Sequence, residues 1–263
     1  MLDDDLGRPE TSLRSLRLLL ILEEVAKVGV PATPTEVNKS IGLPKQTLHR
    51  MFASLEAQGF LQREHDGRSY SPGLRMRSMA INTISSPGSR AARLAVMSRL
   101  AKDIGETCNL SIPDRDAMIY ADRIETEWPL RIQLPIGTRV PLHCTASGKL
   151  YLSTLPKNQL ARILDNTDLE QRTSKTLATK EALSNEIERI RAEGFSEDNE
   201  EFMEGMIALA VPIKGRGGRF LSALAFHAPT PRMPFSAAHQ HLDRLHEAAA
   251  ELAHILIEDS GDA

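Results

Sequence analysis

The sequence predicts two domains of different class: an N-terminal winged helix-turn-helix, which is mainly α, and a C-terminal α+β domain. Two observations indicate the first domain. They are a pair of short, capped helices within residues 33–58 and an Asp-Gly hairpin signal shortly after them. The third observation is a change of hydrophobic period after residue 106, from a helical repeat to the alternation that is typical of strands. A chain of 263 residues is long enough for two domains.

The first segments are a tail and a long helix. We expect residues 1–10 to be disordered and residues 12–28 to form a helix that ends near Gly29. Apolar residues cover more than one face of this helix, so it is expected to be buried on two sides. One side packs on its own domain and the other on a partner subunit. Full burial within one domain is the alternative.

The helix pair is defined by its caps. Thr33 is expected at the N-cap, Pro34 at the first helical position and Glu36 at the third, which makes a capping box. Gly42 ends this helix, because glycine adopts a left-handed conformation without strain. The second helix runs from Pro44 to about residue 58. Its buried stripe is Leu48, Met51, Phe52 and Leu55.

The other side of the second helix has the chemistry of a DNA-contacting surface. It holds no acid between residues 44 and 55, and its donor-rich side chains suit phosphates and base edges in a major groove. An ordinary amphipathic helix with a solvated polar face is the alternative. The residues expected to contact bases are Gln46, Thr47, His49 and Arg50, and those expected to contact phosphates are Lys45, Arg63 and Arg68.

The hairpin completes the winged helix. Strands are expected at 60–63 and 68–70, and Asp66-Gly67 between them favours a type I′ turn. A helix-turn-helix followed by a hairpin predicts binding to double-stranded DNA. We therefore assign residues 11–73 to a DNA-binding domain and residues 74–87 to a linker, helical over 74–84.

Charge separates along the chain, although the total is only −3. Residues 8–84 hold 11 Lys or Arg against 7 acids, whereas residues 85–263 hold 21 against 25. The basic part coincides with the predicted DNA-binding domain, as phosphate neutralisation requires. The excess of positive charge in residues 8–84 is modest, so it favours a dimer, in which this excess is doubled.

Composition excludes several classes of protein. Cys108 and Cys144 are too few for a disulfide framework or a zinc ribbon, and the acidic N-terminus has the wrong charge for a signal peptide. No apolar run approaches the ~18–20 residues that span a bilayer. We expect a cytoplasmic protein with no membrane contact, no metal and no cofactor.

The second domain is expected over residues 88–258. Helices are expected at 90–105, 149–154, 156–164, 179–193 and 236–257, and strands at 107–112, 117–124, 130–134, 206–213 and 220–227. Pro113-Asp114 is expected as a turn. The result is an antiparallel sheet of five or six strands with a concave face for a ligand.

Three polar segments of this domain could carry a site. Residues 145–149 open a helix whose exposed amides suit a carboxylate, with a plain capped turn as the alternative. The acidic run at 197–204 is expected to be a solvated loop rather than a metal site. The histidines of the last helix are expected at the surface: His239, His241, His246 and His254.

Over about residues 12–257 the chain resembles the IclR family of bacterial transcription regulators. IGLPKQTLHRMFASLEAQGF (41–60) is similar to the family's recognition segment, VPLHCTASGK (140–149) to its effector-domain loop, and GFSEDNEEFMEGMIALAVPI (194–213) to its second signature. The resemblance implies a GAF-like effector-binding domain, operator DNA as a partner, a small and often carboxylated effector, and self-association into a dimer or a tetramer.

The resemblance also implies an effector pocket in this chain. Ile132 and Val140 would be apolar walls, Ala146 and Ser147, next to Thr145, would offer backbone amides, and Asp198 would be the pocket acid. Ala208 falls where glyoxylate-sensing relatives have Cys, and Ala225 and His227 fall where they have Ser. This departure predicts a larger or more apolar ligand, for example an aromatic acid.

The function that these features imply is a ligand-responsive DNA-binding regulator of a catabolic operon, either a repressor or an activator, and not an enzyme. One alternative is an architectural DNA-binding protein that takes no ligand. The other is a hydrolase that uses Ser147, Lys149 or His143 with Asp198. The sequence shows no nucleophile with a base and an orienting group, so no catalytic residue is assigned.

Overall fold

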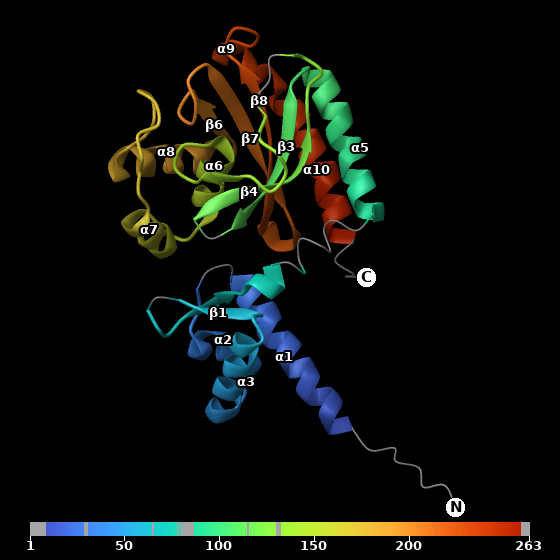
Figure 1. The fold of residues 1–263 in the computed structure, drawn as a ribbon, viewed down its shortest axis with the longest axis vertical. Helices are drawn as coiled ribbons and strands as arrows, with labels where there is room; N and C mark the ends of the chain where they lie inside the picture. Colours follow the sequence, from blue (N-terminus) through green and yellow to red (C-terminus); the bar gives the residue numbers. More distant parts are fainter. Residues whose placement is uncertain are drawn as a thin grey trace, which may run out of the picture. The chain divides into compact units, whose positions relative to one another are not determined.

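The computed structural model describes residues 9–28, 31–64, 66–77, 79, 87–114, 116–129 and 133–258. The chain divides into two compact units, Met1–Ile84 and Ser85–Ala263 (Figure 1). Four expectations lie wholly or partly outside the described residues: the tail over 1–8, the helix end at Gly29, the linker helix beyond residue 79, and Ile132 with most of the strand at 130–134. Within the linker, residues 74–77 are helical.

The first unit is the predicted winged helix-turn-helix. Its elements are α1 (Pro9–Val28), α2 (Pro34–Ile41), α3 (Lys45–Ala57), β1 (Leu61–Arg63) and β2 (Tyr70–Pro72). The capping box of α2 forms, since Thr33 Oγ1 accepts from Glu36 N at 3.3 Å and Glu36 Oε2 accepts from Thr33 N at 2.8 Å. The expected tail was too long, because α1 already begins at Pro9, a residue that suits a first helical turn.

The core of this unit joins α1, α3 and the wing. Ile21 and Val25 of α1 are fully buried, and so is Phe52 of α3, whose ring meets Tyr70 edge-on at 5.0 Å. The predicted stripe of α3 is buried as expected. Leu16, Leu19 and Leu20 of α1 are exposed by about half, so one side of this helix packs inside the unit and another does not.

The wing turn is not the predicted type I′ turn. Glu64 N donates to Ser69 O and Gly67 N donates to Glu64 O, both at 2.9 Å, so the loop is longer than two residues and β2 starts at Tyr70. Asp66 acts through its side chain instead: its Oδ1 accepts from the backbone N of Arg68 and of Ser69, both at 2.8 Å.

The second unit is an antiparallel sheet of six strands in the order β5-β4-β3-β8-β7-β6, as the sequence predicted in class and number. The strands are β3 (Thr107–Asp114), β4 (Ala117–Ile124), β5 (Arg139–Pro141), β6 (Ser196–Asn199), β7 (Met206–Lys214) and β8 (Phe220–Pro229). Residues 216–218 form a short 3₁₀ turn, η1 (Arg216–Gly218), between β7 and β8.

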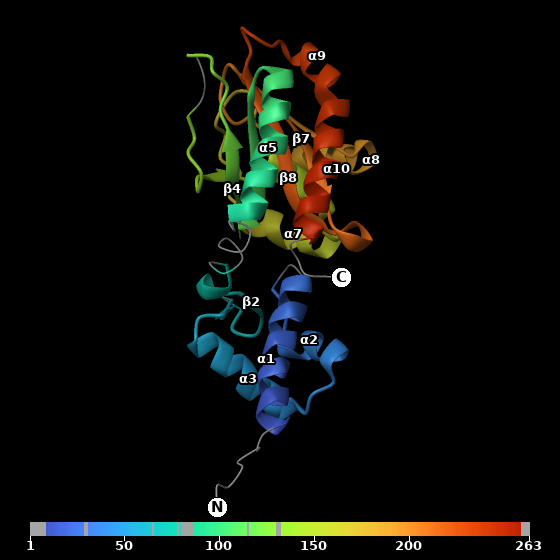
Figure 2. The ribbon, with the colours of Figure 1, turned by 90° about the vertical axis from the view of Figure 1, so that its right-hand side faces the viewer.

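Helices cover both faces of this sheet (Figures 1 and 2). α5 (Pro87–Ile104) and α10 (Leu242–Glu258) lie side by side on one face and bury the apolar core with β7 and β8. α6 (Ala146–Thr154) and α8 (Lys180–Glu193) lie on the other face, and α7 (Lys157–Asn166) connects them in the chain. No helix in the described part of the chain is long and apolar enough to cross a membrane.

Three expectations for this unit were wrong in detail. Pro113 and Asp114 do not turn but pair with Met118 and Ala117. Pro113 is tolerated because β8 pairs with β3 only as far as Ser111, so the other edge needs no amide there. β5 and β6 were both missed: β5 has three residues, too few to show alternation, and β6 lies in the segment that was expected to be a solvated loop.

The third error concerns the last helix, which is broken into α9 (Phe235–Ala238), the 3₁₀ turn η2 (His239–His241) and α10. The break lies where His239 pairs with Glu197 and packs edge-on against Phe195 and Phe235. His239 and His241 are therefore half-buried rather than at the surface, whereas His246 and His254 are exposed.

Candidate functional site

The exposed side of α3 is the candidate nucleic-acid interface. Lys45, Gln46, His49 and Arg50 are exposed and Thr47 is half-buried, while the apolar stripe behind them is buried. Pro44 at the N-cap makes no side-chain hydrogen bond, and the first turn holds no acid. The amides of this turn therefore keep their capacity to donate to a phosphate.

The two wing arginines differ in their surroundings. Arg68 is exposed beside the turn. Arg63 binds Glu56 with a 2.8 Å contact, donates from Nη1 to Gly67 O at 3.2 Å, and lies over the Tyr70 ring. Arg63 thus braces the wing, and only the part of its side chain that remains exposed is open to a phosphate.

The candidate effector site lies on the sheet face that α6 covers. Strand pairing sets Ala208 of β7 between Asp198 of β6 and His227 of β8, and it sets Ala225 of β8 one pleat away on the same face. His227 therefore lies on the same face of the sheet as Asp198, Ala208 and Ala225. Val140 of β5 is buried beside Met118 of β4.

The N-terminus of α6 is more enclosed than predicted. Residues 142–150 are all buried, and α6 begins at Ala146, three residues earlier than expected. Thr145 Oγ1 accepts from Gly148 N at 3.1 Å and donates to Pro141 O at 2.6 Å. A Cβ on Gly148 would lie 2.5 Å from Leu142 Cα, so this turn packs directly on the preceding backbone. The amides of Ala146 and Ser147 belong to a buried turn, not an exposed one.

The acidic run is not the solvated loop that the sequence suggested. Asp198 and Glu201 are buried, and Asp198 Oδ1 accepts from Glu201 N at 2.7 Å and from Phe202 N at 3.3 Å. Burial, reinforced by the Glu201 charge, raises the pKa of Asp198 to about 7. The reason for the burial is Lys149 of α6, a fully buried cation that forms an ion pair with Glu201.

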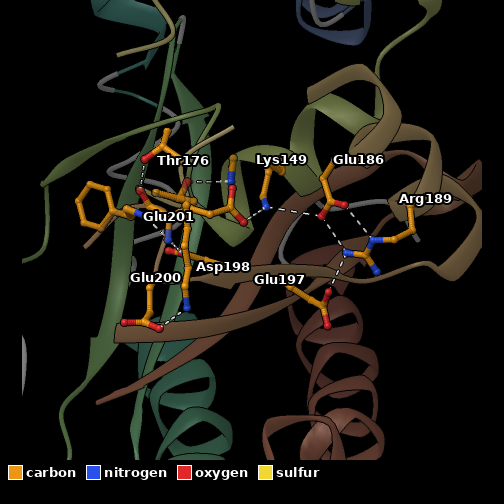
Figure 3. Close-up of polar contacts among 12 residues, drawn as sticks. Lys149, Thr176, Glu186, Arg189, Glu197, Asp198, Glu200 and Glu201 are labelled. Atoms are coloured by element: carbon orange, nitrogen blue, oxygen red, sulfur yellow. Dashed lines mark hydrogen bonds and ion pairs between the residues drawn. The ribbon is translucent and has the colours of Figure 1, made fainter. Parts of the chain in front are cut away.

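This ion pair begins a chain of charges that Figure 3 shows. Lys149 also lies 3.5 Å from Glu186 of α8, and Arg189 binds Glu186 at 2.8 Å and Glu197 of β6 at 2.9 Å. The chain therefore fastens α6, α8 and the edge strand β6 to one another.

Sequence reasoning missed two buried polar residues beside the candidate site, Asn109 of β3 and Arg123 of β4. Both are buried next to His227: Arg123 Nη1 donates to Asn109 Oδ1 at 2.8 Å, and Asn109 Nδ2 lies 3.0 Å from His227 Nδ1. Burial and the Arg123 charge lower the pKa of His227 to about 3, so its ring is neutral at pH 7. The polar residues Thr107, Asn109 and Ser111 alternate along β3, and this was the available signal.

The arrangement does not support the hydrolase alternative. Lys149 is bound in ion pairs, and His143 Nε2 lies 3.0 Å from the backbone oxygen of Glu170. Burial raises the pKa of the Cys144 thiol to about 12, which keeps it protonated and a poor nucleophile. Within the described residues, no group of three or more His, Cys, Asp or Glu side chains is arranged to hold a metal ion.

Two family models match the chain, and together they cover both units. The model of the bacterial transcriptional regulator IclR C-terminal domain matches residues 81–254, and the model of the IclR helix-turn-helix domain matches residues 14–65. The probable transcriptional regulator SauR of Cupriavidus necator is 38% identical over 238 residues, which are 90% of this chain and 94% of that protein. The regulator KdgR of Escherichia coli is 28% identical over 260 residues, 96% of each chain.

Solved structures share the architecture. Thermotoga maritima IclR matches with a TM-score of 0.61 and 25% identity, covering 92% of this chain and 98% of that one. An IclR homologue of Microbacterium hydrocarbonoxydans, complexed with 4-hydroxybenzoate, matches with a TM-score of 0.59 and 21% identity, covering 91% and 98%. The second likeness shows the fold alone.

The protonation of Asp198 predicts how stability depends on pH. Because the folded pKa is raised from 3.8 to about 7, the folded protein holds this proton more tightly than the unfolded chain does. The stability that this provides is complete below about pH 4 and is lost as pH rises through 7. Asp198→Asn keeps the acceptor Oδ1 but does not titrate. Between pH 5 and pH 8 it should therefore lose less stability than the unmodified protein, by about 2.6 kcal/mol.

Urea unfolding at the two pH values measures this difference. Asp116→Asn is the control, because the side chain of Asp116 is 80% exposed. Equal losses in Asp198→Asn and in the unmodified protein would show that Asp198 is ionised in the folded state.

Proposed function

The chain belongs to the IclR family of bacterial transcriptional regulators, and we propose that it binds operator DNA as a dimer and alters that binding when a small carboxylic acid enters the second unit. The families and relatives that it matches are regulators and not enzymes. The observation that carries the proposal is the exposed, acid-free side of α3 beside a wing, joined in one chain to a domain with a buried polar face.

On DNA, α3 lies in a major groove and the wing lies against the backbone. Gln46, Thr47, His49 and Arg50 contact bases, while Lys45, Arg63 and Arg68 contact phosphates. The protein acts in the cytoplasm, since its operator DNA is there. In keeping with the family, the regulated genes form a catabolic operon.

The effector is an aromatic acid, which combines a carboxylate with an apolar body. Ala208 and Ala225 supply methyl groups where glyoxylate-sensing relatives have polar side chains, and His227 supplies a neutral ring. The Microbacterium relative was crystallised with such an acid, 4-hydroxybenzoate. That ligand belongs to that protein, and the ligand class proposed here rests on this chain's own residues.

The dimer forms through α1. Leu16, Leu19 and Leu20 of this helix are 51%, 56% and 47% exposed and lie three and four residues apart, on one side. A surface of three exposed leucines is stabilised when a second copy covers it. Two heads related by a two-fold axis would then contact a near-palindromic operator.

The DNA contact is tested on Arg50. Arg50→Ala should weaken binding to a duplex selected from a random-sequence pool by about 1–3 kcal/mol, because a base contact and its discrimination are lost. Fluorescence anisotropy against the selected and a scrambled duplex measures both quantities. Lys102→Ala removes an equal charge from α5 of the second unit and should have no effect. Undiminished discrimination in Arg50→Ala would refute the base contact.

The effector response is tested with the full chain and a panel of acids: glyoxylate, pyruvate, benzoate and 4-hydroxybenzoate. An acid at about 100 times its dissociation constant should stabilise the protein by about 2.7 kcal/mol and change the affinity for the selected duplex. A panel that changes neither the melting temperature nor DNA affinity would favour the architectural alternative.

The α1 surface is tested by Leu19→Glu. A charge in an apolar interface should shift the protein from dimer to monomer in analytical ultracentrifugation and weaken DNA binding with it. Leu74→Glu is the control, because Leu74 is 72% exposed and lies outside α1. A dimer of unchanged affinity in Leu19→Glu would place the interface elsewhere.

A further inference from the structure

We propose that Arg123, Asn109 and His227 form the end of the effector site that binds the carboxylate, and that Arg123 makes the site selective for an anion over its neutral analogue. This inference rests on the proposed effector function, which it makes more specific. The three residues come from the adjacent strands β4, β3 and β8.

Strand pairing brings the three side chains together on the face that α6 covers. Asn109 pairs with Arg123 on one side and with Ala225 on the other, and His227 pairs with Thr107, one pleat from Asn109. The Arg123 side chain is 3% exposed, and Asn109 and His227 are buried as well. A guanidinium this deep favours an anion beside it, because burial removes the water that solvates its charge.

The cluster offers more donors to His227 than the ring can accept. Arg123 only donates, so its 2.8 Å contact fixes Asn109 Oδ1 as the acceptor and directs Asn109 Nδ2 toward the imidazole. Asn109 Nδ2 lies 3.0 Å from His227 Nδ1, and Arg123 Nη1 lies 3.3 Å from His227 Nε2. Both neighbours thus offer N–H groups to the ring.

A neutral imidazole has one acceptor nitrogen and one N–H, so it can satisfy only one of these two donors. At the other contact, the N–H of the ring faces an N–H group of its neighbour, so no hydrogen bond forms there. A carboxylate that binds against Arg123 and His227 and takes the place of one of these contacts resolves this mismatch, since its oxygens accept from the guanidinium and from the ring N–H together. Glu125 contacts Arg123 at Nε, but the side chain of this glutamate is 37% exposed and lies two residues along the chain, just beyond β4.

The face next to the cluster suits the body of an organic acid. Ala208, Ala210, Ala223 and Ala225 present methyl groups on β7 and β8. The buried hydroxyls of Ser111 and Ser196, on the same face, have no hydrogen-bond partner among the described residues. From β3 to β6 the face spans three strand spacings, about 14 Å. Two orphan hydroxyls and a floor of methyl groups fit a ligand with a polar group on an apolar body.

The far end of this face does not repel an acid. Asp198 of β6 is the acid nearest the alanine floor in strand pairing, opposite Ala208. Burial raises its pKa to about 7, so near neutral pH a large fraction of it is uncharged. The positive end of the site is therefore at Arg123.

Isothermal titration calorimetry on the full chain tests the proposal with matched pairs: benzoate and benzamide, 4-hydroxybenzoate and 4-hydroxybenzamide, pyruvate and pyruvamide. We expect at least one acid to bind at least tenfold more tightly than its amide. Arg123→Gln should weaken that acid by at least thirtyfold and leave the amide unchanged. Arg123→Lys should fall between, because it keeps the charge but not the planar donor pair.

Two further variants keep the result interpretable. Arg139→Gln changes a half-exposed arginine on the neighbouring strand β5 and should bind every ligand as the unmodified protein does. Asn109→Asp places a carboxylate inside the cluster, so it should raise the melting temperature and abolish acid binding. Each variant is checked by circular dichroism and by its melting temperature, because binding to the selected duplex would report only the first unit.

The outcomes separate this inference from the proposed function. If an acid binds the unmodified protein and binds Arg123→Gln equally well, the role of Arg123 is refuted while the effector function stands. If acids and amides bind the unmodified protein equally, charge selection is refuted. If Asn109→Asp still binds an acid, the carboxylate end is refuted. If no acid binds the unmodified protein, both the carboxylate end and the proposed effector class are refuted.

Discussion

The alternation of side chains across the six-stranded sheet is the constraint on which the second unit depends. One face carries the large apolar residues that α5 and α10 bury, such as Leu209 and Phe226. The opposite face carries small and polar residues, among them Ala208, Ala225 and His227. Since a shift of register by one residue would exchange the two faces, the apolar core fixes the positions of the polar groups. Packing of the apolar core on the face that α5 and α10 cover therefore fixes the positions of the candidate site residues on the opposite face.

Buried charge holds the polar face in shape. Lys149 is fully buried, and its ion pair with Glu201 ties α6 to the turn that Asp198 caps (Figure 3). Such a pair contributes little net stability, because desolvation offsets much of the attraction. Removing one partner is destabilising, however, because it leaves the other charge buried and unpaired. The pair instead fixes position: it holds α6, which covers the alanines of β7 and β8, and Asp198 of β6 in place relative to each other.

The sequence predicted the elements whose signals are local and missed those that depend on distant partners. The caps of α2, the two faces of α3 and the glycine that ends α8 are encoded within a few residues, and they formed as expected. β5 has only three residues and exists because β4 offers an edge. Arg123 and Asn109 form a polar cluster only together with His227, which is more than a hundred residues away in the chain. Likewise the acidic run around Glu201 was predicted to be solvated because its partner Lys149 is far from it in the chain.

The strand β4 connects the polar face to the start of the second unit. Consecutive residues of a strand point to opposite faces, and Arg123 and Asp122 do so: Arg123 contacts Asn109, while Asp122 accepts from Arg90 Nε at 3.1 Å and Arg93 Nε at 2.9 Å. Both arginines lie in the first two turns of α5, the helix that directly follows the linker in the chain. A ligand that binds Arg123 would therefore contact β4, the strand whose Asp122 holds the N-terminal end of α5. Such a ligand would change DNA binding only if it bound one arrangement of β4 and α5 better than another, because a ligand shifts an equilibrium only by its difference in affinity for the two states. The buried Arg123 guanidinium on one face and the buried Arg93–Asp122 ion pair on the other hold β4 in its present arrangement, since neither can move without breaking hydrogen bonds that water does not replace.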